Sequence, residues 1–181
     1  MLLYRVFAHA AAARPGQPGH PLYVHPAQGQ GRWDNPSAYL AWYLASEQTG
    51  AVAEVFAHLS VWRDAMFAFP QIPGARRALG VYRLPDDLPY VDLDDPQALL
   101  DRGMRPSRVI ERNRPYTQAK ALEVYNEQRW SGIRWWSLHR PQWRVWCLWE
   151  IAPSCEEVQE LDVTHVAVRD AASALAKPIV E

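Results

Sequence analysis

Short apolar runs bounded by turn residues predict most of the strands of this chain. The expected strands are residues 2–8, 80–84, 89–93, 132–138, 145–151 and 163–168. Residues 39–45 form a further candidate strand, although their length and composition also suit a helix. Residues 14–31 are rich in glycine, proline and glutamine, so we expect an irregular and exposed loop there.

Apolar residues at helical spacing predict a helix over residues 50–63, for which Ser46 or Thr49 is the candidate cap. The same spacing predicts another helix over residues 117–128. These helices stand between the expected strands without a regular strand–helix–strand repeat and without an internal sequence repeat. We therefore expect an α+β fold in which residues 1–181 form a single domain with a mixed β-sheet flanked by helices.

Start and stop signals predict one more helix, beginning after Asp95. Pro96 would occupy its first position, and Gly103 lies just beyond its expected end. This order of capping residue, proline and glycine is the usual one at the two ends of a helix.

Length and composition fit one soluble domain with a sizeable core. Of the 181 residues, 49% are hydrophobic, and the net charge of −1 offers no concentrated positive surface for nucleic acid. The arginine-rich residues 102–114 leave a local basic surface open. Cys147, within an apolar run, and Cys155 make neither a disulfide framework nor a zinc set. We recognise neither a signal peptide nor a membrane span, so the expected compartment is the cytoplasm.

The first candidate site residue is Arg32, which lies between glycines and Trp33 at the end of the expected loop. An arginine there can present a planar fork to an anion and bind two phosphate oxygens at once. The alternative is a structural arginine packed on Trp33.

Two further residues carry candidate chemistry. Glu54 borders the apolar stripe of its helix, where its carboxylate either reaches out to solvent or is partly buried beside a site. Partial burial would indicate a site, because a desolvated carboxylate is costly unless it is paired or used. Glu54 could share a metal with His58, but no second ligand set accompanies them, so no metal is expected. Ser137 ends an apolar strand, where its hydroxyl can donate to a phosphate or an amide; the alternative is an ordinary turn serine. Without a Gly-x-Ser-x-Gly elbow it is not expected to be a nucleophile.

The short segments that stand out are, in chain order, Tyr4-Arg5-Val6, Gly31-Arg32-Trp33, Tyr43-Leu44-Ala45, Ala53-Glu54-Val55 with His58, Thr117-Gln118, and residues 132–137. Together these segments resemble the RES-domain family, the toxin half of RES/Xre toxin–antitoxin pairs. Each is short, and the specificity lies in their order and spacing over about residues 2–150.

The resemblance assigns the family's arginine, glutamate and serine to Arg32, Glu54 and Ser137, and its active-site tyrosine to Tyr43. The chain departs from the family pattern after Trp33. Asp34 stands where the family commonly has asparagine, and Pro36-Ser37-Ala38 replaces a glycine-containing turn. Tyr39 therefore competes with Tyr43 for the tyrosine position.

The resemblance further implies an ADP-ribosyltransferase-like fold and cleavage of the nicotinamide–ribose bond of NAD. Because this cleavage passes through an oxocarbenium-like ribose, Glu54 would stabilise the developing positive charge. Arg32 would hold a phosphate with Trp33 beside it, Tyr43 would stack against or bond to the nicotinamide half, and Ser137 would bind phosphate or the amide. NAD is the expected substrate, inorganic phosphate is a candidate co-substrate, and no prosthetic group is expected.

The acceptor of the ADP-ribosyl group stays open. Phosphate gives an NAD phosphorylase, water an NAD glycohydrolase and a protein side chain an ADP-ribosyltransferase. Two alternatives of other classes are a nucleotide-binding module with little turnover and an RNA-directed toxin, against which the near-neutral charge counts. The resemblance also implies an Xre-like antitoxin with a helix-turn-helix domain as the partner that covers the NAD site.

Overall fold

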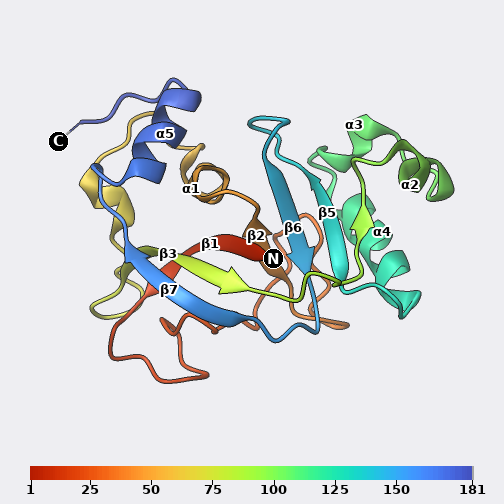
Figure 1. Ribbon diagram of the computed structural model, residues 1–181, viewed down its shortest axis with the longest axis horizontal. Coiled ribbons are helices and arrows are strands. Elements are labelled where there is room, and N and C mark those ends of the chain that lie inside the picture. The colour runs from red at the N-terminus through yellow and green to blue at the C-terminus, as the bar shows by residue number, and fades with distance from the viewer. Residues whose placement is uncertain (181) are drawn as a thin grey trace. The chain divides into compact units, whose positions relative to one another are not determined.

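The computed structural model describes residues 1–180, and its strands form a mixed sheet (Figure 1). The strands are β1 (Leu2–His9), β2 (Trp42–Ala45), β3 (Arg76–Arg83), β4 (Val91–Asp92), β5 (Gly132–Trp136), β6 (Arg144–Leu148) and β7 (Ser154–Glu160). Their order is β4-β5-β6-β2-β1-β3-β7. The β4–β5 pair is parallel, whereas β1–β2, β1–β3, β3–β7 and β5–β6 are antiparallel. The predicted α+β fold with a mixed sheet is confirmed.

The described helices are distributed between two compact units of the chain. They are α1 (Gln48–Phe56), α2 (Pro96–Asp101), α3 (Pro106–Val109), α4 (Arg114–Asn126), α5 (Val166–Ala174) and a 3₁₀ turn, η1 (Asp64–Phe67). The first unit comprises Met1–Tyr23, Ala45–Leu84 and the chain from Pro153 onwards; the second comprises Val24–Leu44 and Pro85–Ala152. None of the helices within residues 1–180 is long and apolar enough to cross a membrane.

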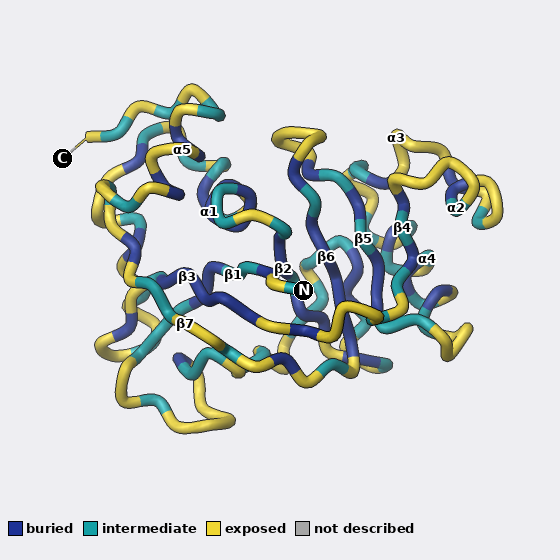
Figure 2. The backbone as a smooth tube through the Cα atoms, viewed as in Figure 1, coloured by how far each residue is buried: buried dark blue, intermediate teal, exposed yellow. Residues whose placement is uncertain are grey.

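The first unit is built on the long pairing of β1 with β3, which runs unbroken from Leu2 opposite Arg83 to His9 opposite Arg76. Helix α1 packs against both strands, and α5 packs against α1. Figure 2 shows the dark, buried stretch that runs along β3. Apolar side chains shared by β1, β3 and α1 thus form the core that fixes α1, the helix that carries Glu54.

The second unit is built on β4, β5 and β6, with α4 packed against β5. Its core holds Trp33, Ile133, Leu148 and Trp149, each no more than 1% exposed. Cys147 lies in the same core as a free thiol, and burial raises its pKa well above the ordinary value. The candidate residues Arg32, Tyr43 and Ser137 belong to this unit.

The sequence predicted the helix in the first unit with the wrong ends. It begins at Gln48 and ends at Phe56, short of the predicted end at residue 63. Its N-cap is Glu47, which makes no capping bond through its side chain, so Ser46 and Thr49 are not the caps. The apolar pattern of the sequence extends past the helix end to Trp62. This residue is fully buried although it is not helical, because its backbone pairs with Ile179.

The predicted strand at residues 163–168 is wrong, because His165 caps a helix there by accepting a bond from Ala167 N–H. Strand β7 was not predicted at all, since its sequence is polar and it lies at the edge of the sheet. The helix after Asp95 is confirmed: the Asp95 side chain accepts from Gln97 N–H at 2.9 Å, and Gly103 adopts a left-handed φ of 60°.

Candidate functional site

A buried carboxylate organises the loop that carries Arg32. Asp34 is 5% exposed, and its Oδ2 accepts from the backbone N–H groups of Gly29 at 2.8 Å and Gly31 at 2.6 Å. Its Oδ1 accepts from the Tyr43 hydroxyl at 2.7 Å. Hydrogen bonds to a charged acceptor are stronger than those between neutral groups, so Asp34 holds the loop on both sides of Arg32.

Tyr43 completes this arrangement through its hydroxyl group. The oxygen accepts from Trp33 N–H at 2.9 Å while its proton goes to Asp34. Burial is the main cause that raises the pKa of Tyr43 well above 10.0, and the negative charge of Asp34 acts in the same direction. Its ring lies edge-on to Trp135, with centroids 6.4 Å apart. Tyr43 is therefore a neutral phenol whose proton is already donated within the protein.

Position 31 requires glycine because two side-chain atoms of the loop lie too close to it for a Cβ atom. A Cβ at this position would lie 2.4 Å from Asp34 Oδ1 and 2.4 Å from the Tyr43 hydroxyl oxygen. Both distances are well inside van der Waals contact, and both atoms are held by hydrogen bonds. Any side chain at position 31 would force the Asp34–Tyr43 pair apart.

Arg32 is half-buried and anchored at two points. Its guanidinium Nη1 donates to the backbone carbonyl of Glu111, and its own carbonyl accepts from the Thr117 hydroxyl at 2.6 Å. Thr117 is fully buried on α4. These contacts fix the arginine against the segment that leads into α4.

Gln118 adds a second clamp from the same helix. Its amide nitrogen donates to the carbonyls of Gly29 at 3.0 Å and Gly31 at 2.9 Å. In return, its backbone carbonyl accepts from the Asn35 side chain at 2.9 Å. The Thr117-Gln118 pair thus serves to hold the Arg32 loop.

Tyr39, the competitor of Tyr43, is the more buried of the two at 5% exposure. Its hydroxyl donates to Trp33 O at 2.5 Å and accepts from Asn35 Nδ2 at 3.0 Å. Its ring packs on Tyr125 and Trp149, with centroid distances of 4.9 and 4.6 Å. The two tyrosines therefore bind the carbonyl and the N–H of the same tryptophan, and Tyr43 is the less buried of the two.

Ser137 follows the end of β5, as predicted, and is 1% exposed. Its hydroxyl oxygen accepts from His139 N–H at 3.1 Å, and its own N–H donates to Trp143 O at 2.8 Å. These bonds are those of a turn serine, which is the alternative that the sequence left open. The role of Ser137 toward a ligand stays a prediction.

Glu54 lies on α1 in the first unit, where its side chain is exposed and follows the fully buried Ala53. Of the two environments left open by the sequence, the structure shows the exposed one. The structure brings Arg32, Trp33 and Tyr43 together in the second unit, whereas the grouping of Glu54 with them stays a prediction. His58, one turn later, is also exposed.

The functional interpretation of the sequence missed Asp34 and Gln118. Asp34 was recognised only as a departure from the family pattern, yet its carboxylate is the centre of the loop. A signal was present, because aspartate side chains in turns commonly bond to nearby backbone N–H groups. Gln118 was noted only within the Thr117-Gln118 segment of the resemblance, and its role could not be predicted because its partners are 87 and 89 residues away.

Comparison with known proteins identifies the family. The model of the RES domain matches residues 2–170. The chain belongs to the RES-domain family. One chain of the crystal structure of the M. tuberculosis MbcT–MbcA toxin–antitoxin complex is similar to this RES-domain protein, with a TM-score of 0.64 and 18% identity over 94% of this chain and 88% of that one. At this identity the likeness shows a shared fold. No curated protein matches the chain.

Proposed function

We propose that this RES-domain protein is the toxin of a toxin–antitoxin pair and that it cleaves the nicotinamide–ribose bond of NAD. The observation that carries the proposal is the loop in which Asp34 and Tyr43 hold Arg32 on both sides. Family membership and the fold shared with a chain of a toxin–antitoxin complex support it. The activity is assigned to the cytoplasm, and an Xre-like antitoxin with a helix-turn-helix domain is the proposed partner.

Arg32 is proposed to bind a phosphate of NAD or an incoming inorganic phosphate. Its position is fixed by backbone contacts, so little conformational entropy is lost when an anion binds. Trp33, fully buried behind it, keeps the loop in place.

Tyr43 is proposed to present its ring to the nicotinamide half. Its hydroxyl proton is committed to Asp34, which favours stacking over donation of a hydrogen bond to the carboxamide. Ser137 is proposed to contribute its hydroxyl to phosphate or to the amide.

Glu54 is proposed to stabilise the positive charge that develops on the ribose as nicotinamide leaves. The assignment rests on the family resemblance, because the carboxylate is exposed on α1 and lacks the partial burial that would itself indicate a site. The electrostatic attraction is strongest in the transition state, and such differential stabilisation is what accelerates a reaction.

The direct test is to incubate the purified protein with NAD, with and without inorganic phosphate, beside an Arg32→Ala variant. Nicotinamide release is followed by chromatography. Release that depends on phosphate and on Arg32 establishes an NAD phosphorylase, and release without phosphate indicates hydrolysis, or ADP-ribosylation if the label appears on protein. If folded protein free of antitoxin releases no nicotinamide while NAD raises its Tm, the protein is a binding module and the proposal fails.

A further inference from the structure

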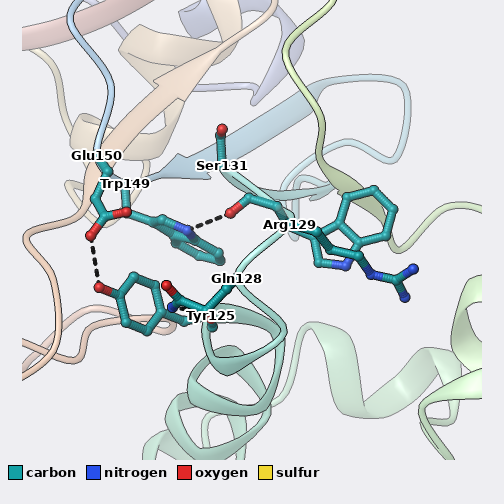
Figure 3. A pocket seen from close by; sticks show the side chains of 7 residues that line it. Tyr125, Gln128, Arg129, Ser131, Trp149 and Glu150 are labelled. Carbon is teal, nitrogen blue, oxygen red and sulfur yellow. Dashed lines mark hydrogen bonds between the residues drawn. The ribbon is translucent and has the colours of Figure 1, made fainter.

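A pocket in the second unit is lined by residues other than Arg32, Tyr43 and Ser137. Figure 3 shows it at the end of α4, beside the residues that follow β6. The cavity measures about 220 Å³. The side chains that line it are Tyr125, Gln128, Arg129, Trp130, Ser131, Trp149 and Glu150.

The wall of this pocket carries hydrogen-bond acceptors on Glu150 and Gln128. Glu150 Oε1 accepts from the Tyr125 hydroxyl at 2.7 Å, and Glu150 forms no ion pair within the described residues 1–180. Gln128 Nε2 donates to Tyr125 O at 2.9 Å, which leaves the amide oxygen of Gln128 as a further acceptor. A carboxylate and an amide oxygen together favour a ligand rich in donors.

The one cationic side chain that lines the pocket, Arg129, is paired with Glu127, a carboxylate that also pairs with Arg102. Arg129 Nη2 lies 2.8 Å from Glu127 Oε2, and its guanidinium stacks over the Trp130 ring at 4.8 Å from the centroid. In Figure 3 its guanidinium group lies on the far side of the pocket from Glu150. The charge of Glu150 is therefore the one that a ligand would meet.

Rigid aromatic side chains form the base of the pocket. Trp149 is 1% exposed, and its indole N–H donates to Trp130 O at 2.8 Å. The Tyr125 ring packs edge-on against the Trp149 ring, with an interplanar angle of 79° and centroids 5.9 Å apart. Aromatic rings fixed in this way attract cations, and planar cations can also stack on them.

Two residues of the pocket have backbone angles that favour glycine. Gln128 has a φ of 54° and Glu150 a φ of 52°, both in the left-handed region. Gln128 follows the C-cap Glu127 of α4, the position that glycine most often occupies at a helix end. Long polar side chains at two such positions, both lining one cavity, indicate a role that the turns alone do not require.

We propose that this pocket binds a guanidinium group, from a small molecule or from an arginine side chain of another protein. The carboxylate of Glu150 and the amide oxygen of Gln128 accept its N–H donors, and the aromatic rings that line the cavity favour its positive charge. The cavity is smaller than a drug-sized site and fits one such group.

The test is a titration of ¹⁵N-labelled protein with methylguanidinium, with urea as a smaller, uncharged analogue that has the same trigonal planar core. We expect saturable shifts of the indole signals of Trp130 and Trp149, with a dissociation constant on the order of 1 mM for so small a probe. Glu150→Gln should weaken binding at least tenfold, whereas Glu123→Gln, an exposed glutamate of α4, should leave it unchanged. Equal shifts with urea, or unchanged binding in Glu150→Gln, would overturn the proposal.

The Glu150→Gly variant distinguishes a role of Glu150 in ligand binding from a role in folding. Glycine relieves the left-handed backbone, so this variant should lose methylguanidinium binding without a fall in Tm. A lower Tm with binding intact would mean that Glu150 is structural, and the proposal would fail. An acetylated, amidated arginine peptide and free arginine distinguish the two sources of the guanidinium group. Tighter binding of the peptide would indicate an arginine side chain of another protein, and tighter binding of free arginine would indicate a small molecule. None of these readouts depends on NAD cleavage.

Discussion

The Tyr43 hydroxyl donates to Asp34 Oδ1 at 2.7 Å and at the same time accepts from Trp33 N–H at 2.9 Å. Both bonds cross the loop that carries Arg32. The phenol is thus a structural support for the loop as well as the candidate aromatic contact of the nicotinamide half. These two roles can be separated by substitution.

Tyr43→Phe should retain NAD cleavage within about tenfold while lowering stability. The ring stays, but the buried N–H of Trp33 loses its acceptor, which costs about 1 to 3 kcal/mol. Tyr43→Ala should lose both stability and activity. The measurements are urea denaturation and the rate of nicotinamide release. An inactive but stable Tyr43→Phe variant would show that the hydroxyl itself takes part in the reaction.

Gly31→Ala should destabilise the loop, because its Cβ would lie 2.4 Å from both Asp34 Oδ1 and the Tyr43 oxygen. We expect a loss of about 1 to 3 kcal/mol of unfolding free energy and a large loss of nicotinamide release. Ser37→Ala, in an exposed position of the same loop, is the matched control and should behave as the wild type. Calorimetry and the nicotinamide assay check the result; a fully stable and active Gly31→Ala variant would contradict the observed packing.

Glu54→Gln should keep NAD binding and lower the rate of nicotinamide release on the order of 10³-fold, because only the charge near the ribose is removed. The side chain is exposed, so Tm should change little. Glu47→Gln, another exposed carboxylate at the start of the same helix, is the control. Undiminished release in Glu54→Gln would remove Glu54 from the catalytic assignment.

Unfolding free energy should fall as the pH rises above about 10. Burial raises the pKa values of Tyr39, Tyr43 and Tyr82 above the ordinary value of 10.0. In the unfolded chain these phenols ionise near 10.0, so the stability they contribute is fully present below that pH. It is lost above it, by about 1.4 kcal/mol per pH unit for each phenol.

Denaturation series between pH 8 and 11, with tyrosinate absorbance as a second readout, check this dependence. The Tyr43→Phe variant removes one of the three phenols, so its stability should fall less steeply with pH. An identical slope in the variant would mean that Tyr43 ionises freely in the folded protein.

Elements with local signals could be predicted from the sequence, and elements defined by distant partners could not. The helix after Asp95 was predicted at both ends because its cap, proline and glycine are within eight residues of one another. Strand β7 escaped prediction because an edge strand needs no alternating apolar face, and its pairing with β3 depends on residues far away in the chain. The end of α1 was misjudged because Trp62 is buried by its pairing with Ile179, which helical periodicity does not reveal.

The same division holds for the candidate site. The Gly31-Arg32-Trp33 segment was predicted because its residue types indicate anion binding. The geometry that supports it depends on Asp34, on Gln118 and on the position of the Tyr43 ring, none of which follows from residue type alone. Ser137 was predicted at the end of its strand, but its burial and its bond to His139 became visible only in the fold.

The missing side chain of Gly31 has a consequence for how this sequence can vary. Every other amino acid adds at least one carbon atom to the space between Asp34 and Tyr43. Even the smallest substitution, to alanine, would therefore disturb the loop. Arg32, by contrast, can be exchanged without disturbing that space, because its side chain is directed toward the carbonyl of Glu111. In a random library selected for folding alone, position 31 should therefore remain glycine, whereas position 32 should accept other residues with the loss of the side-chain bond to Glu111.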